Sequence, residues 1–166
     1  MLLQDPSTIN RQLTDSFTGN VLTIFSVNAT SLAKKGAIER MATEALHNSI
    51  DVLAVCETWF TSQMTSDLLN INGYKLFRVD RPNRKGGGVC FYVNNDICCE
   101  QVASVSPSIN VEIVWIRVVY YSVVYYIACC YYPPNPCFTA VDFMNPLSAD
   151  LDRILVARVN YVRIVH

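Results

Sequence analysis

A glutamate at the end of an apolar segment is the first residue of this sequence that could carry chemistry. Residues 52–56 (Val-Leu-Ala-Val-Cys) have the pattern of a buried strand, and Glu57 follows them directly. A carboxylate at the exit of a buried strand can reach a cleft without being buried unpaired. Mg²⁺ commonly binds one or two such carboxylates together with waters and phosphate oxygens. By its position alone, Glu57 could equally be a solvated residue in a loop.

Two further polar side chains lie at the ends of apolar segments. Asn28 follows the apolar run 21–27, and its amide can both donate and accept hydrogen bonds. Tyr131 precedes Tyr-Pro-Pro, where the prolines stop sheet pairing. Each side chain could bind a phosphate oxygen beside a cleft. The ordinary alternatives are an asparagine in a turn and a tyrosine of the core.

A basic loop offers the third set of candidates. Arg81, Arg84 and Lys85 crowd a polar segment that closes with three glycines at 86–88. The basic side chains could contact phosphates of a substrate, and the glycines allow close backbone approach. The Gly-x4-Gly-Lys-Ser/Thr spacing of a Walker loop is missing from this segment. A flexible, solvated turn explains it about as well.

The elements that must position these residues alternate between strand and helix patterns. Between the apolar runs 21–27 and 52–56, apolar residues repeat at helical spacing after Ser31, which predicts a helix capped by that serine. A second helix is predicted from Asn145 as its N-cap and Pro146 as its first residue. Further strands are expected at 73–77, at 89–93, on both sides of a turn at 120–122, and at 161–165. This order predicts an α/β protein with helices packed outside its sheets.

The most apolar stretch, residues 111–132, has nearly the length of a membrane span. Glu112, Arg117 and Ser122 interrupt it, and it contains six tyrosines and many β-branched residues. A membrane helix needs about 20 apolar residues with few or no charges, whereas tyrosine and valine favour strands. We therefore expect two buried strands here and no contact with a membrane.

Composition limits the remaining possibilities. The chain has 166 residues, a net charge of −1 and 16% charged residues, which excludes disorder and any attraction to nucleic acid through bulk charge. Residues 1–20 form a polar leader without a secretory signal, and residues 21–166 suit one domain. The seven cysteines contain no Cys-x-x-Cys pair, which favours reduced thiols in an intracellular protein that is not secreted.

Four motifs in a fixed order carry a family resemblance. They are Ser-Val-Asn-Ala (26–29), Cys-Glu-Thr-Trp-Phe (56–60), the basic triple-glycine loop (81–88) and Tyr-Tyr-Pro-Pro-Asn (131–135). With them, the chain resembles the endonuclease/exonuclease/phosphatase superfamily. It is most similar to the apurinic-type endonuclease domain of non-LTR (LINE-like) retrotransposons.

This resemblance implies a fold and a reaction. The fold would be a four-layer α/β sandwich, with two sheets face to face and helices outside. The reaction would be hydrolysis of phosphodiester bonds in the DNA backbone with Mg²⁺ or Mn²⁺, in a nuclear protein if the parent retroelement is active. Glu57 matches the family's metal-binding glutamate, Asn28 its active-site asparagine and Tyr131 its phosphate-contacting tyrosine.

Two catalytic motifs of the family are missing from the sequence. Neither Gly-Asp-Phe-Asn nor a later Ser-Asp-His occurs, and residues 142–145 (Asp-Phe-Met-Asn) come too early, before the predicted second helix. The first motif is due just after the strand at 161–165, where the sequence ends. We therefore expect the N-terminal half to two-thirds of the domain, truncated and inactive alone. The alternatives are a non-catalytic remnant or gene-model fragment, and an inositol-phosphate or sphingomyelin phosphodiesterase of the same superfamily.

Overall fold

The computed structural model describes residues 21–82, 84–105, 111–156 and 161–165. The predicted leader at 1–20 lies outside the described residues, so that boundary stays a prediction.

The first sheet carries Asn28 and Glu57 to the same edge. Its four strands have the order β1 (Ile24–Asn28), β2 (Val52–Cys56), β4 (Val89–Asn94) and β3 (Tyr74–Val79). β1 and β2 are parallel and joined through helix α2 (Ala37–His47), whereas β4 is antiparallel to both of its neighbours. A short 3-10 helix, η1 (Ser66–Leu69), precedes β3. Since parallel strands end at the same edge, Asn28 lies opposite Cys56 in the register, one residue before Glu57.

The second sheet contains the predicted strand pair. Its order is β5 (Cys98–Val102), β6 (Glu112–Tyr120), β7 (Val123–Tyr131) and β8 (Tyr161–Val165). β6 and β7 form a hairpin whose turn lies at Tyr121 and Ser122, as the sequence predicts. Helix α3 (Ala140–Val156) connects β7 to β8, which pairs parallel to it.

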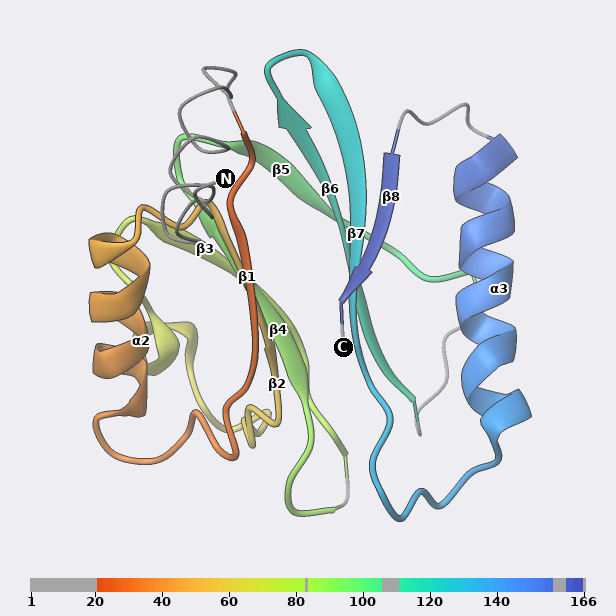
Figure 1. Cartoon of the computed structure of the whole chain (residues 1–166). Helices are drawn as coiled ribbons and strands as arrows, with labels where there is room; N and C mark the ends of the chain where they lie inside the picture. Colours follow the sequence, from red (N-terminus) through yellow and green to blue (C-terminus); the bar gives the residue numbers. More distant parts are fainter. Residues whose placement is uncertain (1–20, 83, 106–110, 157–160, 166) are drawn as a thin grey trace, which may run out of the picture.

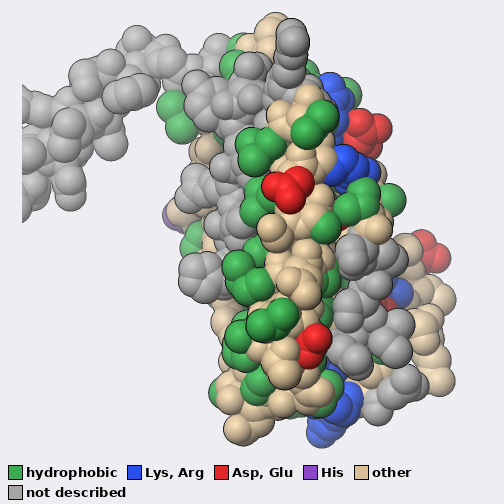
Figure 2. All heavy atoms as spheres, turned by 90° about the vertical axis from the view of Figure 1, so that its right-hand side faces the viewer, with side chains coloured by type: hydrophobic (Ala, Val, Ile, Leu, Met, Phe, Trp, Pro, Cys, Tyr) green, Lys and Arg blue, Asp and Glu red, His purple; other side chains and the backbone are tan. Residues whose placement is uncertain are grey.

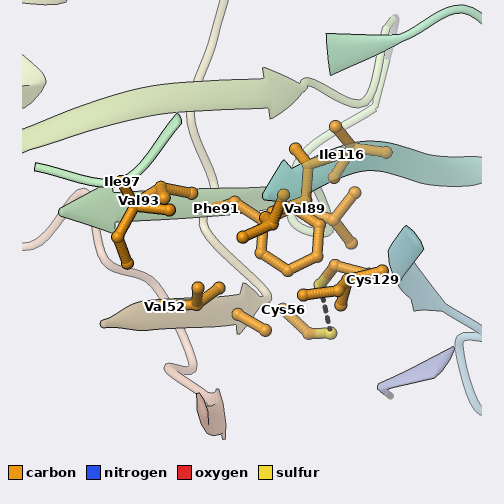
Figure 3. Packing of buried hydrophobic residues seen from close by; sticks show 12 residues of the cluster. Val52, Cys56, Val89, Phe91, Val93, Ile97, Ile116 and Cys129 are labelled. Atoms are coloured by element: carbon orange, nitrogen blue, oxygen red, sulfur yellow. Dashed lines mark hydrogen bonds between the residues drawn. The ribbon is translucent and has the colours of Figure 1, made fainter. Parts of the chain in front are cut away.

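The two sheets pack face to face between the two helices (Figure 1), which confirms the predicted four-layer sandwich. The layer between the sheets contains buried side chains such as Val52, Phe91 and Ile116 (Figure 3). Ile127 belongs to the same cluster. α2 covers the opposite face of the first sheet, where Leu53 is fully buried, and α3 covers the second. A strand covered on both faces is apolar throughout, which explains the unbroken runs seen in the sequence.

The first helix begins later than predicted. α2 starts at Ala37 after Gly36, whose φ of 75° is left-handed, and Ser31 does not cap it. Ser31 is buried in the preceding loop, where its backbone N–H donates to the carbonyl oxygen of Glu57 over 2.8 Å. The prediction that Ser31 caps this helix was therefore wrong. Ser31 instead binds the loop that follows β2 through its backbone N–H.

The second helix begins earlier than predicted. Thr139 and Asp142 exchange hydrogen bonds, with the Thr139 N–H donating to Asp142 Oδ2 (2.8 Å) and the Asp142 N–H donating to Thr139 Oγ1 (3.2 Å). This reciprocal cap satisfies free amides at the helix start, so α3 begins at Ala140. Asn145 and Pro146 lie inside the helix, and the cap predicted there was wrong. The segment 142–145, predicted to precede the helix, is also part of it.

The outer surface of α3 carries exposed apolar side chains. Figure 2 shows hydrophobic side chains along this side of the molecule. On α3, the side chains of Val141, Met144 and Leu155 are more than half exposed. In the described part of the chain, no helix has the length and apolar character needed to cross a membrane.

Candidate active site

Asn28 and Tyr131 come together at one end of the sandwich. They line a common hollow of about 460 Å³, together with Cys56, the neighbours of Tyr131 on either side, and Phe143 and Leu147 of α3. Glu57 follows Cys56 directly and leaves β2 with a left-handed φ of 57°. The three predicted residues thus lie at the ends of β1, β2 and β7, although the hollow itself is lined by only two of them.

The Glu57 carboxylate is held by two donors. Its Oε2 atom accepts a hydrogen bond from Trp59 Nε1 at 2.5 Å and another from the Gly87 backbone N–H at 3.2 Å. Oε1 accepts no hydrogen bond from the residues that the structure describes. The side chain is therefore fixed in direction through one oxygen, while the other remains available to a ligand.

Backbone hydrogen bonds hold the strained turn after β2. Both Glu57 and Trp59 are non-glycine residues with left-handed φ angles, of 57° and 58°. The Trp59 N–H donates to the Gly87 carbonyl oxygen over 2.8 Å, and the Thr58 N–H donates to that of Gly88 over 3.2 Å. Such backbone angles persist only where their surroundings over-determine them, and here the triple-glycine loop supplies that restraint.

A buried ion pair links this loop to the second sheet. Glu112, only 4% exposed, accepts a hydrogen bond from the Gly88 N–H at 2.7 Å, and its other oxygen pairs with Arg81 Nε. The Arg81 guanidinium also lies over the Tyr131 ring, 5.6 Å from its centroid. Two consecutive backbone amides therefore bind the two carboxylates. The Gly87 N–H donates to Glu57, at the end of a strand of the first sheet, and the Gly88 N–H donates to Glu112 of the second sheet.

Glu112 is a site residue that the sequence analysis missed, having treated it only as an interruption of an apolar run. The available signal was its charge, because a glutamate in a buried strand is almost always paired. Its partner Arg81 was predicted to contact substrate. The structure places the Arg81 side chain, 11% exposed, in this internal pair.

The other two predicted basic residues are exposed. Arg84 and Lys85 lie on the loop surface, and Lys85 Nζ is 5.4 Å from the centroid of the Trp59 ring. Lys34 approaches the same ring to 6.0 Å from a different loop. Lys34 was not singled out in the sequence, because only the fold brings it beside Trp59. These exposed cations create a local positive surface next to Glu57.

Reduced thiols lie beneath the site. None of the seven cysteines is in a disulfide, and Cys56 Sγ lies 3.7 Å from Cys129 Sγ. The hydrogen bond with Cys129 lowers the pKa of Cys56, whereas burial raises the pKa of Cys130 to about 11.

Comparison with known proteins shows the fold. No family model matches the sequence, and no curated protein is significantly similar to it. Among solved structures, the endonuclease domain of TRAS1, a telomere-specific non-LTR retrotransposon, matches with a TM-score of 0.54 at 15% identity over 81% of this chain. The Xenopus laevis APE2 catalytic domain matches with 0.60 at 13% over 84%, and an endonuclease/exonuclease/phosphatase family protein from Leptotrichia buccalis with 0.53 at 16% over 82%.

The chain has the endonuclease/exonuclease/phosphatase fold. It spans 52%, 56% and 63% of these three solved chains, and so covers only part of their length. Sequence identities this low establish the fold and leave the roles of individual residues open. The assignments to Asn28, Glu57 and Tyr131 therefore stay predictions.

Within this endonuclease/exonuclease/phosphatase fold, Glu57 has one property of a ligand for the expected Mg²⁺ ion. Mg²⁺ takes few protein ligands and keeps several waters, so one carboxylate oxygen without a hydrogen bond is a suitable contribution. Among the described residues, no group of three or more His, Cys, Asp or Glu side chains could hold a metal ion. The described part of the fold would thus supply fewer than three such side chains, Glu57 among them, and water and phosphate oxygens would complete the coordination.

Proposed function

We propose that this chain is part of a Mg²⁺-dependent phosphodiester hydrolase, a DNA endonuclease of the kind carried by non-LTR retrotransposons. The observation that carries this proposal is the convergence of the ends of β1, β2 and β7, which brings Asn28, Glu57 and Tyr131 to one end of the sandwich. Solved examples of the same fold include a retrotransposon endonuclease domain and the APE2 catalytic domain.

Each residue has a distinct role in this proposal. Glu57 would hold Mg²⁺ or Mn²⁺ through its Oε1 atom, while Trp59 and Gly87 orient the carboxylate through Oε2. The bound metal supplies positive charge that offsets charge on the phosphate oxygens and the leaving group. Asn28 and Tyr131 line the hollow, and a side-chain amide and a phenol can each donate a hydrogen bond to a phosphate.

The exposed cations favour DNA as the polyanion that binds here. Because the net charge of the chain is −1, any contact with phosphates depends on local groups such as Arg84 and Lys85. Lys85 lies over the Trp59 ring, whose indole N–H donates to Glu57, and Arg84 is the residue before it, so the two could position a DNA backbone beside the carboxylate. Arg81 would act differently, by holding Glu112 and the Tyr131 ring in place.

Binding of Mn²⁺ to Glu57 should quench the fluorescence of Trp59, whose indole N–H lies 2.5 Å from the carboxylate. Replacing Glu57 with glutamine should raise the half-saturating Mn²⁺ concentration at least about tenfold, equivalent to about 1.4 kcal/mol. Glu100→Gln is the matched control, because Glu100 is an exposed residue of β5. Equal titration curves for the wild type and Glu57→Gln would contradict the metal assignment.

The isolated chain should not nick supercoiled plasmid DNA in the presence of Mg²⁺. Its 166 residues contain neither the Gly-Asp-Phe-Asn nor the Ser-Asp-His motif, and each lost acid or base group typically removes 10² to 10⁴ in rate, as an order of magnitude. Gel electrophoresis of plasmid incubated with the wild type and with Glu57→Ala should show the same background. Efficient nicking that Glu57→Ala abolishes would show that the chain is catalytically sufficient.

A further inference from the structure

Two buried thiols, one from each sheet, face one another in the layer between the sheets, beneath the hollow (Figure 3). Cys56 ends β2 of the first sheet and Cys129 belongs to β7 of the second, with 3.7 Å between their sulfur atoms. Each sulfur also approaches the opposite backbone. Cys56 Sγ is 3.4 Å from the Cys130 carbonyl oxygen, and Cys129 Sγ is 3.7 Å from that of Val55.

The two strands that carry these thiols lie against each other. Facing sheets usually lie about 10 Å apart, and β2 and β7 have Cα atoms within 8 Å of one another. A disulfide needs an S–S distance of about 2.0 Å and Cα atoms less than about 7 Å apart. The two sulfur atoms, 3.7 Å apart, would have to approach by roughly 1.7 Å to form this bond.

One of these thiols can be reached from outside. Buried cysteines are ordinarily inert because reagents cannot reach them. Cys56, although only 3% exposed, lines the hollow of about 460 Å³ that also contains Asn28 and Tyr131. A small oxidant such as a peroxide fits this opening, and Cys129 lies immediately behind Cys56.

We propose that Cys56 and Cys129 form a redox modification site, at which hydrogen peroxide converts the two thiols into a disulfide between the sheets. The Cys56 sulfur attacks one peroxide oxygen and the O–O bond breaks, which gives a sulfenic acid and water. The Cys129 sulfur then attacks the Cys56 sulfur, the S–O bond breaks, and a second water leaves. In total, two thiols lose two protons and two electrons, and the peroxide is reduced to two waters.

The crosslink would join the strands that carry the candidate site. Cys56 directly precedes Glu57, and Cys129 is two residues before Tyr131. The bond would also close a loop between residues 73 positions apart in the chain. This inference depends on the fold and the thiol geometry, and it stands whether or not the chain binds a metal or DNA.

Hydrogen peroxide applied to the native full chain provides the test. After alkylation in denaturant and proteolysis, mass spectrometry should identify the peptides of Cys56 and Cys129 joined by a disulfide as the dominant product. The oxidised protein should also unfold at a higher denaturant concentration, because a long loop is closed in its unfolded state. The same treatment in urea should give mixed pairings, since proximity is then lost.

Cysteine variants separate this pair from general oxidation. Cys56→Ser and Cys129→Ser should each abolish the crosslinked product, and Cys137→Ser, at an exposed cysteine, should leave it unchanged. The proposal is overturned if Cys56 and Cys129 remain alkylatable while the exposed Cys98 and Cys137 become sulfinic or sulfonic acids. The wild-type peptide map decides this even if a serine variant fails to fold.

Discussion

Replacing Glu112 with alanine should lower the free energy of unfolding by about 3–5 kcal/mol, because it leaves the Arg81 guanidinium buried without a counter-charge. The Glu112 and Arg81 side chains are 5% and 11% exposed, so water cannot replace the lost carboxylate fully. The Gly88 N–H loses its acceptor in the same variant. Urea denaturation followed by circular dichroism measures the change.

The exposed ion pair of the second sheet supplies the matched control. Glu100 lies 3.3 Å from Arg117, and its side chain is 65% exposed. Exposed pairs contribute about 0–1 kcal/mol, so Glu100→Ala should change the stability by no more than that. The double variant Arg81→Met with Glu112→Leu should recover part of the loss, because it removes both buried charges. Similar losses for the two single glutamate variants would contradict the buried-pair argument.

The sequence allowed the architecture to be predicted because the inner strands β2 and β4 are buried along nearly their whole length. Such strands are continuously apolar, as in residues 52–56, and their order between helical patterns fixes the layers. Strand β5 was missed because Cys-Cys-Glu-Gln-Val lacks both an apolar run and alternation. It is a strand because its backbone pairs with β6, which no local pattern reveals.

Two sequence patterns near the start of α3 predict different first residues for this helix. Asn145 followed by Pro146 is typical of a helix start, but Thr139 with Asp142 three residues later is typical of one as well. In the structure the second signal determines the start, since each of its side chains caps a backbone amide of the other residue. Pro146 is accommodated inside α3, where it is buried. The Thr-x-x-Asp pattern was visible in the sequence and could have been used.

The candidate site was predictable only in its strand-end residues. Asn28 and Glu57 each follow an apolar strand, so their approach follows from a parallel pairing of those strands. The Arg81–Glu112 pair joins residues 31 positions apart, one in the loop between β3 and β4 of the first sheet and one in β6 of the second, and it depends on how the sheets stack. No spacing rule predicts that contact.

A methyl group on Gly88 should disturb both carboxylates of the site at once. The Cβ atom of an alanine there would lie 2.4 Å from Thr58 Oγ1, and Thr58 is fully buried. The left-handed φ of 82° adds about 1–2 kcal/mol of backbone strain, and overpacking adds about 1–3 kcal/mol more. We therefore expect Gly88→Ala to lower the free energy of unfolding by about 2–5 kcal/mol in urea denaturation.

The same substitution at Gly73 distinguishes the two contributions to that loss, which are backbone strain and overpacking. Its φ of 86° matches that of Gly88, but an added Cβ would meet no atom within 4 Å. Gly73→Ala should therefore cost only the backbone strain of about 1–2 kcal/mol. The remaining loss in Gly88→Ala then measures how tightly Thr58 packs against the glycine loop.

In the Gly88→Ala variant the Gly87 and Gly88 amides shift away from Glu57 and Glu112, so Mn²⁺ quenching of Trp59 should weaken as well. Equal stability losses for the two alanine variants, with unchanged quenching, would show that the glycine loop does not position the carboxylates.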